Sequence, residues 1–284
     1  MLTRRGRIRH HGVPVTGGDA GGGPVFEILA IRYGTVRSTK SDLYYRFHAY
    51  GEPDGPVDMD FFFYVLRGDA ETILIDTGFR PDAAPPRGRQ CLIAPRDALE
   101  RLGVDPAGVA RLVITHFHWD HIGNVDLFGD AELYLPEREL EFWTKPVARN
   151  VQFWGAVDPG PLGELVEAHQ EGRAVATGDE HQIAPGVRTI TVGGHSPGQQ
   201  IVVVDTARGP VALASDAVHF YEELELERPF AVTVDLREVC EAYTLLKRLA
   251  SESGTLVVAG HDPEVAIRFP SLGGDADQVA YRIA

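Results

Sequence analysis

Cysteine is scarce in this chain of 284 residues, where Cys91 and Cys240 stand far apart and without CxxC spacing. We therefore expect no disulfide framework, and a reducing, cytoplasmic compartment is the default. Long apolar runs are also missing, because no stretch reaches the roughly 20 residues of a membrane-spanning helix. The composition is 44% hydrophobic and 24% charged, which is typical of a globular protein with a sizeable core.

Positive charge is in short supply. The chain has 27 Lys and Arg against 41 Asp and Glu, which gives a formal net charge of −14. This balance argues against nucleic acid or an anionic membrane surface as the main partner and favours a neutral or small ligand.

Residues 1–24 lack the apolar core that a signal peptide needs after its positive residues. They carry Arg4, Arg5, Arg7 and Arg9 and then a Gly-rich run. We expect a disordered tail, with an upstream start or a targeting segment as alternatives, followed by one domain over residues 25–284.

Hydrophobic patterning predicts many short strands with helices set among them. The strands are expected at 26–36, 59–66, 72–75, 111–115, 131–135, 187–192, 200–205, 210–215 and 255–259, and the helices at 95–102, 137–144, about 164–169 and 235–250. A capping box of Asp235 and Glu238 opens the last helix, and residues 37–57 are expected to form a long loop. This pattern favours an α/β protein with sheets covered by helices, in the best case a four-layer αββα sandwich.

A dense cluster of metal-binding side chains follows the apolar run 112–114: His116, His118, Asp120 and His121. In an extended segment the first three point to one side, and His121 joins them if the chain turns, which Gly123 permits. Imidazole with carboxylate suits zinc, with iron, manganese or cobalt as alternatives. Four side chains crowd a single small ion, so two adjacent ions are easier. Surface histidines at a strand end are the alternative.

Three later residues each follow an apolar run of their own: His195, Asp216 and His261. Taken singly, each is more often a capping or surface residue. Together they share a position at the carboxyl ends of strands, where sites are usually built on sheets.

The order of these motifs resembles the metallo-β-lactamase fold superfamily, over nearly all of residues 25–270. Asp76-Thr77-Gly78 matches the motif whose aspartate supports a ligand histidine in that family. The resemblance implies two metal ions: His116, His118 and His195 around one, Asp120, His121 and His261 around the other, and Asp216 bridging them. It further implies hydrolysis by a metal-bridging hydroxide that attacks a carbonyl carbon, with Asp120 passing a proton to the leaving group.

Within the superfamily, the chain looks most like the N-acyl homoserine lactonases and 4-pyridoxolactonase. The similar stretches are 76–78, 118–124, 215–221 and 260–263. In the best-known homoserine lactonases a tyrosine stands three residues after the bridging aspartate and assists the lactone carbonyl. Here that position is His219, and Tyr221 lies two residues on; either could assist, or both simply pack. Gln199 stands where many relatives have a histidine.

An aromatic rim is expected around a lactone with an acyl chain or a flat ring, although core packing is the alternative for most of its members. The candidates are Phe61, Phe62, Tyr44, Tyr45, Trp119, Phe142, Trp143, Phe153 and Trp154.

Other functions on the same scaffold stay open, and so does assembly into a homodimer. A β-lactamase would usually be exported, a glyoxalase-type thioesterase would carry basic residues near its C-terminus, and a nuclease would want positive charge. An iron-bearing oxidoreductase is a further alternative, and so is a binding module with a degraded site, against which the complete set of seven ligands argues.

Overall fold

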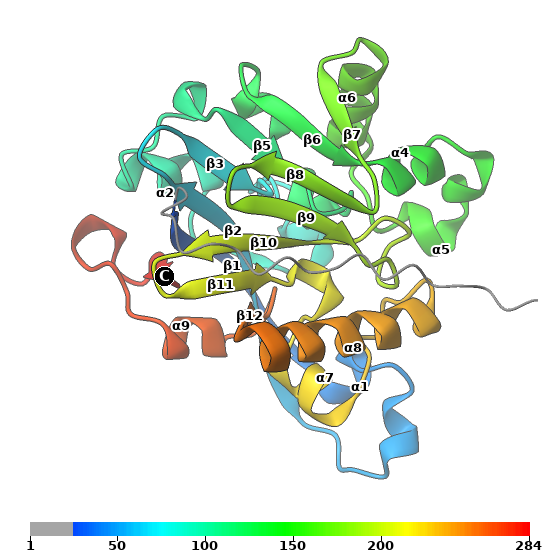
Figure 1. Ribbon diagram of the computed structural model, residues 1–284. Helices are drawn as coiled ribbons and strands as arrows, with labels where there is room; N and C mark the ends of the chain where they lie inside the picture. Colours follow the sequence, from blue (N-terminus) through cyan, green and yellow to red (C-terminus); the bar gives the residue numbers. More distant parts are fainter. Residues whose placement is uncertain (1–24) are drawn as a thin grey trace, which may run out of the picture.

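Two β-sheets face each other in the computed structural model, which describes residues 25–284 (Figure 1). The tail expected over residues 1–24 lies outside the described residues. The first sheet has the order β13-β1-β2-β3-β5-β6-β7, and β4 pairs with β1. Its strands are β1 (Glu27–Thr39), β2 (Pro56–Arg67), β3 (Thr72–Ile75), β4 (Gln90–Cys91), β5 (Arg111–Val113), β6 (Glu132–Pro136), β7 (Ala174–Thr177) and β13 (Ala280–Arg282).

The second sheet has the order β12-β11-β10-β9-β8. Its strands are β8 (Glu180–Ala184), β9 (Val187–Thr191), β10 (Gln200–Thr206), β11 (Gly209–Leu213) and β12 (Leu256–Val258). The helices are α1 (Lys40–Leu43), α2 (Pro95–Arg101), α3 (Trp119–Ile122), α4 (Glu137–Trp143), α5 (Val151–Trp154), α6 (Pro159–Gln170), α7 (Tyr221–Leu226), α8 (Leu236–Ser253) and α9 (Glu264–Arg268).

Strand β2 shows why the sheets are covered on both faces. Phe61 and Phe63 pack in a core cluster with residues of α2, α4 and α6, whereas Phe62 and Tyr64 pack in a second cluster with residues of the other sheet and of α8. Successive side chains of a strand point to opposite faces, so a continuous apolar run indicates burial on both. The predicted four-layer αββα arrangement is confirmed, with α8 along the outer face of the second sheet (Figure 1).

The segment 37–57 is not a plain loop, which corrects the prediction. Strand β1 pairs with β2 in antiparallel register as far as Thr39 opposite Pro56, so both strands run further than their apolar residues indicate. Helix α1 and a 3-10 turn at Phe47–Tyr50 fill the space between them. Helices α5, α7 and α9 were not predicted, because segments of four to six residues are too short to show a helical period.

Helix α8 begins as predicted, and half of its capping box forms. The Asp235 side chain accepts hydrogen bonds from the backbone N–H groups of Arg237 and Glu238. The Glu238 carboxylate does not return to Asp235; it accepts from the Gly194 N–H at 3.1 Å and from Arg138 Nη2 at 2.8 Å. Tertiary contacts with Gly194 and Arg138 thus stand in place of the local hydrogen bond from the Asp235 N–H to the Glu238 side chain.

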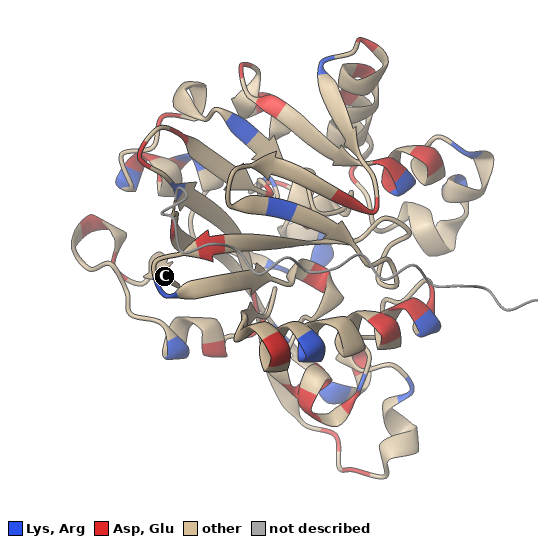
Figure 2. Ribbon diagram, in the orientation of Figure 1, with Lys and Arg blue, Asp and Glu red and all other residues tan. Residues whose placement is uncertain are grey.

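The parallel pairs β3–β5 and β11–β12 bring several carboxyl strand ends to one edge of the sandwich. Helices α8 and α9 carry both signs of charge, and the strands are largely uncharged (Figure 2). Over residues 25–284, no helix combines the length and apolarity needed to cross a membrane.

Candidate metal centre

The histidine cluster divides between an extended segment and one helical turn. His116 and His118 follow β5, and His118 is the N-cap of α3, with extended backbone. The turn of α3 then carries Asp120 and His121. Gly123 serves this turn by its missing side chain and not by a positive φ: a Cβ there would come within 2.7 Å of Gly78 O and of the Arg80 N.

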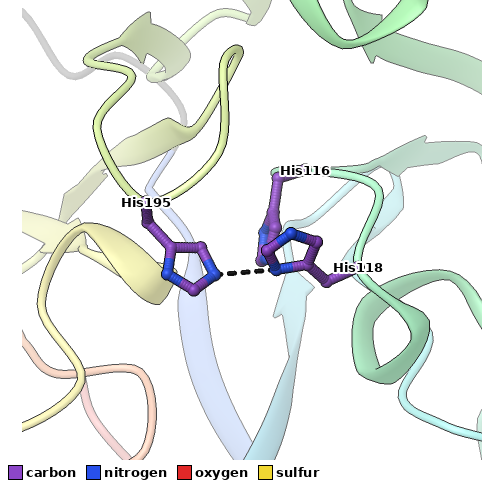
Figure 3. A group of neighbouring side chains, drawn as sticks. All are labelled: His116, His118 and His195. Atoms are coloured by element: carbon purple, nitrogen blue, oxygen red, sulfur yellow. Dashed lines mark hydrogen bonds between the residues drawn. The ribbon is translucent and has the colours of Figure 1, made fainter. Parts of the chain in front are cut away.

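Four groups of these side chains place their nitrogen and oxygen atoms within 4.8 Å of one another. The groups are His116–His118–His195, His116–His121–Asp216, Asp120–His121–His261 and His195–Asp216–His219. The structure thus brings together all seven residues predicted as ligands. In the first group, two loops far apart in sequence meet, with His195 Nε2 at 2.8 Å from His118 Nδ1 (Figure 3).

Hydrogen bonds from the outside orient three of the imidazole rings. The Nδ1 atoms contact Asp76 Oδ2 at 2.8 Å in His121, Asp60 O at 2.8 Å in His261 and Val232 O at 2.9 Å in His195. Each Nε2 atom is thereby left facing the cluster. Within residues 25–284 the buried Nε2 atom of His116 has no hydrogen-bond partner, and that of His121 lies 3.1 Å from Asp216 Oδ1. Converging nitrogen and carboxylate donors of this kind fit a divalent metal ion.

Burial also keeps part of the donor set in the form that binds metal. Burial lowers the pKa of His116 and of His195 well below the ordinary range, so both rings are neutral near pH 7. Burial opposes protonation of His121 as well, but Asp216, Asp76 and Asp120 raise its pKa well above the ordinary value. For Asp216, burial raises the pKa but the surrounding histidines outweigh it and hold it well below the usual range.

Asp76 follows β3 directly and connects this strand to the histidine cluster through hydrogen bonds. It is buried, has a φ of 61°, and accepts from both the backbone N–H and the Oγ1 of Thr115 at 2.8 Å, in addition to its contact with His121. This geometry matches the supporting role expected for the aspartate of the 76–78 motif.

Replacing Asp76 by Asn is expected to weaken metal affinity about 10- to 100-fold, because an amide cannot accept from all three donors at once. Competition with a coloured chelator would measure the change. Asp82→Asn is the matched control, since Asp82 is exposed, lies outside the cluster and pairs with Arg80 at 3.7 Å. Equal affinity of Asp76→Asn and the control would contradict the supporting role.

Glu139 is a fully buried carboxylate that the sequence interpretation missed. It accepts from the Phe117 N–H at 3.0 Å, the Gly198 N–H at 2.6 Å and the Trp143 Nε1 at 2.8 Å. It therefore joins the loop of His116 and His118 to the loop of His195. A single glutamate within a charged helical stretch carries no sequence signal for this role.

His219 faces the cluster, and Tyr221 does not. His219 Nε2 lies 3.1 Å from Asp216 Oδ2, and its ring stacks on Phe230 with centroids 3.6 Å apart. Burial opposes its protonation, but Asp216 and Glu223 raise its pKa to about 9. Tyr221 instead opens α7 beneath Arg268, whose guanidinium lies 3.6 Å from the ring centroid, and lines a separate surface depression.

A cavity of about 310 Å³ opens onto the cluster and is lined by His118, Asp120, His195, Asp216 and His219. Of the aromatic residues expected at the rim, Phe61 and Trp119 line it. The others do not; Phe62 and Trp143, for example, are core residues, and Tyr44 lines the depression beside Tyr221. Seven lining residues were not anticipated: Met59, Arg89, Gln152, Gly155, Ala156, Phe230 and Val232.

Comparison with known proteins places this site in a family. The model of the metallo-beta-lactamase superfamily matches residues 62–261. An N-acyl homoserine lactonase of a Bacillus species is 26% identical over 227 residues, covering 75% of this chain and 85% of its own. The N-acyl homoserine lactonase AttM of Azorhizobium caulinodans is 30% identical, covering 63% of this chain and 68% of its own.

Among solved structures, a quorum-quenching N-acyl homoserine lactone lactonase superposes with a TM-score of 0.72 at 22% identity. The match covers 87% of this chain and 96% of that structure, so the two share the fold. The family model spans most of the sandwich and includes every residue from His116 to His261. The chain therefore belongs to the metallo-β-lactamase superfamily.

Proposed function

We propose that this protein is a metal-dependent hydrolase that opens the ring of a lactone. The observation that carries the proposal is the convergence of seven histidine and aspartate side chains, four of which line a cavity large enough for a small cyclic ester. Relatives that are named N-acyl homoserine lactonases support the choice of a lactone as substrate.

The donors form four overlapping groups, more than one small ion can use, and this supports a pair of ions. The donor types suit zinc, with iron, manganese or cobalt as alternatives. His116, His118 and His195 would hold the first, Asp120, His121 and His261 the second, and Asp216 would bridge them. When bound, the ions would lower the pKa of water to about 7 and so supply hydroxide for attack on the carbonyl carbon.

The remaining chemistry falls to side chains of this chain. Asp120 lines the cavity and would pass a proton to the leaving oxygen when the ring opens. His219 lines the same cavity, and its Nε2 would donate a hydrogen bond to the substrate carbonyl at the position where related lactonases use a tyrosine. Phe230, stacked on the ring, keeps it in that orientation. Tyr221 has no part in this scheme.

The alternatives are another hydrolysis on the same fold, of a thioester or a β-lactam, and an iron-dependent oxidation. The homodimer and the cytoplasmic location stay predictions.

A hydrolysis screen tests the proposal. The metal-loaded protein is offered acyl homoserine lactones of different chain length, 4-pyridoxolactone, a β-lactam and a thioester, and acid release is followed by pH-stat. We expect ring opening of at least one lactone, abolished by chelation. Turnover of the thioester alone would overturn the lactonase assignment, and oxygen uptake without hydrolysis would favour the oxidoreductase.

A further inference from the structure

One side of the cavity is basic and plays no part in the chemistry above. Arg89 lines the cavity next to Trp119, and Gln152 is a further polar lining residue. Arg87 does not line this cavity, although its guanidinium lies 4.6 Å from the centroid of the Trp119 ring. The cavity wall thus includes the positive side chain of Arg89 in a chain whose net charge is −14.

Neither arginine is neutralised by an acid within residues 25–284. Arg87 donates to the backbone oxygens of Ala83 at 3.3 Å and Val157 at 3.5 Å, and Arg89 Nη1 donates to Arg87 O. Among the residues that the structure describes, the buried Nε of Arg89 finds no hydrogen-bond partner. By contrast, Arg138 contacts Glu238 at 2.8 Å.

A guanidinium donor that lines a cavity costs free energy when a bound ligand covers it without supplying an acceptor. A lactone with a neutral alkyl chain would cover Arg89 without giving it a hydrogen-bond acceptor. A carboxylate would satisfy it, because the planar fork of arginine matches two carboxylate oxygens. In an acidic protein, a local positive wall also selects anions that the remaining surface repels.

We propose that Arg89, assisted by the Gln152 amide, forms an anion subsite, and that the preferred substrate is a lactone whose acyl chain ends in a carboxylate. The inference rests on the proposed function for the ring-opening step and adds the chemical class of the acyl chain. The cavity of about 310 Å³ limits the distance between the lactone ring and the carboxylate, because both must lie within it.

The test compares two lactones of matched length, N-glutaryl and N-hexanoyl homoserine lactone, which differ in a terminal carboxylate. In the metal-loaded wild type, kcat/KM is expected to be at least about tenfold higher for the glutaryl compound, and the preference should shrink as salt rises. Arg89→Gln should reduce the ratio of the two values about tenfold, and Arg89→Lys should retain part of it. Arg208→Gln, at an exposed position in the turn between β10 and β11, is the matched charge control and should leave the ratio unchanged.

A binding measurement separates this inference from the proposed function. The corresponding γ-lactams resist ring opening, and calorimetry gives their affinities for the wild type and for Arg89→Gln. Tighter binding of the glutaryl lactam that depends on Arg89 supports the subsite even if neither lactone is hydrolysed, an outcome that would overturn the lactonase assignment alone. Equal affinities for the two lactams, or a ratio that Arg89→Gln leaves unaltered, would overturn the subsite while ring opening stands.

Discussion

Asp120→Asn is expected to lower kcat/KM for lactone opening by about 10²- to 10⁴-fold, because an amide can neither take up nor deliver the leaving-group proton. Its Oδ2 lies 3.7 Å from His121 Nε2 and 4.0 Å from His261 Nε2, the two residues proposed to share a metal ion with it. The rates are measured with metal in excess, and the metal content of the purified variant is determined in parallel by elemental analysis.

The control for this variant is Asp126→Asn. Asp126 is exposed, six residues further along the chain and outside the cavity that opens onto the cluster, so we expect kcat/KM within about twofold of the wild type. Loss of activity with full metal content would assign the proton-transfer role to Asp120, and loss of one ion would assign it the ligand role. Wild-type kcat/KM in Asp120→Asn would remove Asp120 from the mechanism.

Glu139→Ala is expected to have the largest effect on stability, with a loss of about 3–5 kcal/mol in the free energy of unfolding. The substitution leaves two backbone N–H groups and the Trp143 indole N–H without their buried acceptor. It also releases the connection between the loops of His118 and His195, so metal affinity should fall with stability. Urea unfolding at fixed protein and metal concentration measures the first effect, and chelator competition the second.

Two further variants sharpen the result. Glu139→Gln keeps one acceptor oxygen but turns an N–H group toward one of the donors, so we expect an intermediate loss. Glu137→Ala removes an exposed carboxylate from the same helix and should change stability by no more than about 0.5 kcal/mol. If Glu139→Ala unfolds at the same urea concentration as Glu137→Ala, the three hydrogen bonds do not join the loops as we describe.

The fold class and the meeting of the seven side chains could be predicted from the sequence because both follow from short-range patterns. Apolar runs mark strands, and His116 to His121 fall within six consecutive positions. His195, Asp216 and His261 each follow a strand, and carboxyl ends of strands gather at one edge in this kind of sheet. The start of α8 was equally local, since its cap joins Asp235 to residues two and three positions away.

Short helices and the ends of strands cannot be predicted from such local patterns. Helix α7 has six residues and no apolar period, yet its position turns Tyr221 away from the cavity and leaves His219 facing it. The direction of those side chains depends on how the segment after Asp216 packs against α8 and α9, which periodicity does not describe.

Patterns along the chain are enough to predict sheets covered by helices, with imidazoles and carboxylates at the ends of their strands. Which buried acid supports these side chains, and which residues share their cavity, depends on tertiary packing. Glu139 and Gly198 are 59 positions apart, and Arg89 lies 30 positions before Trp119. Such contacts depend on the packing of whole layers, and a single residue of common type gives no sign of them along the chain.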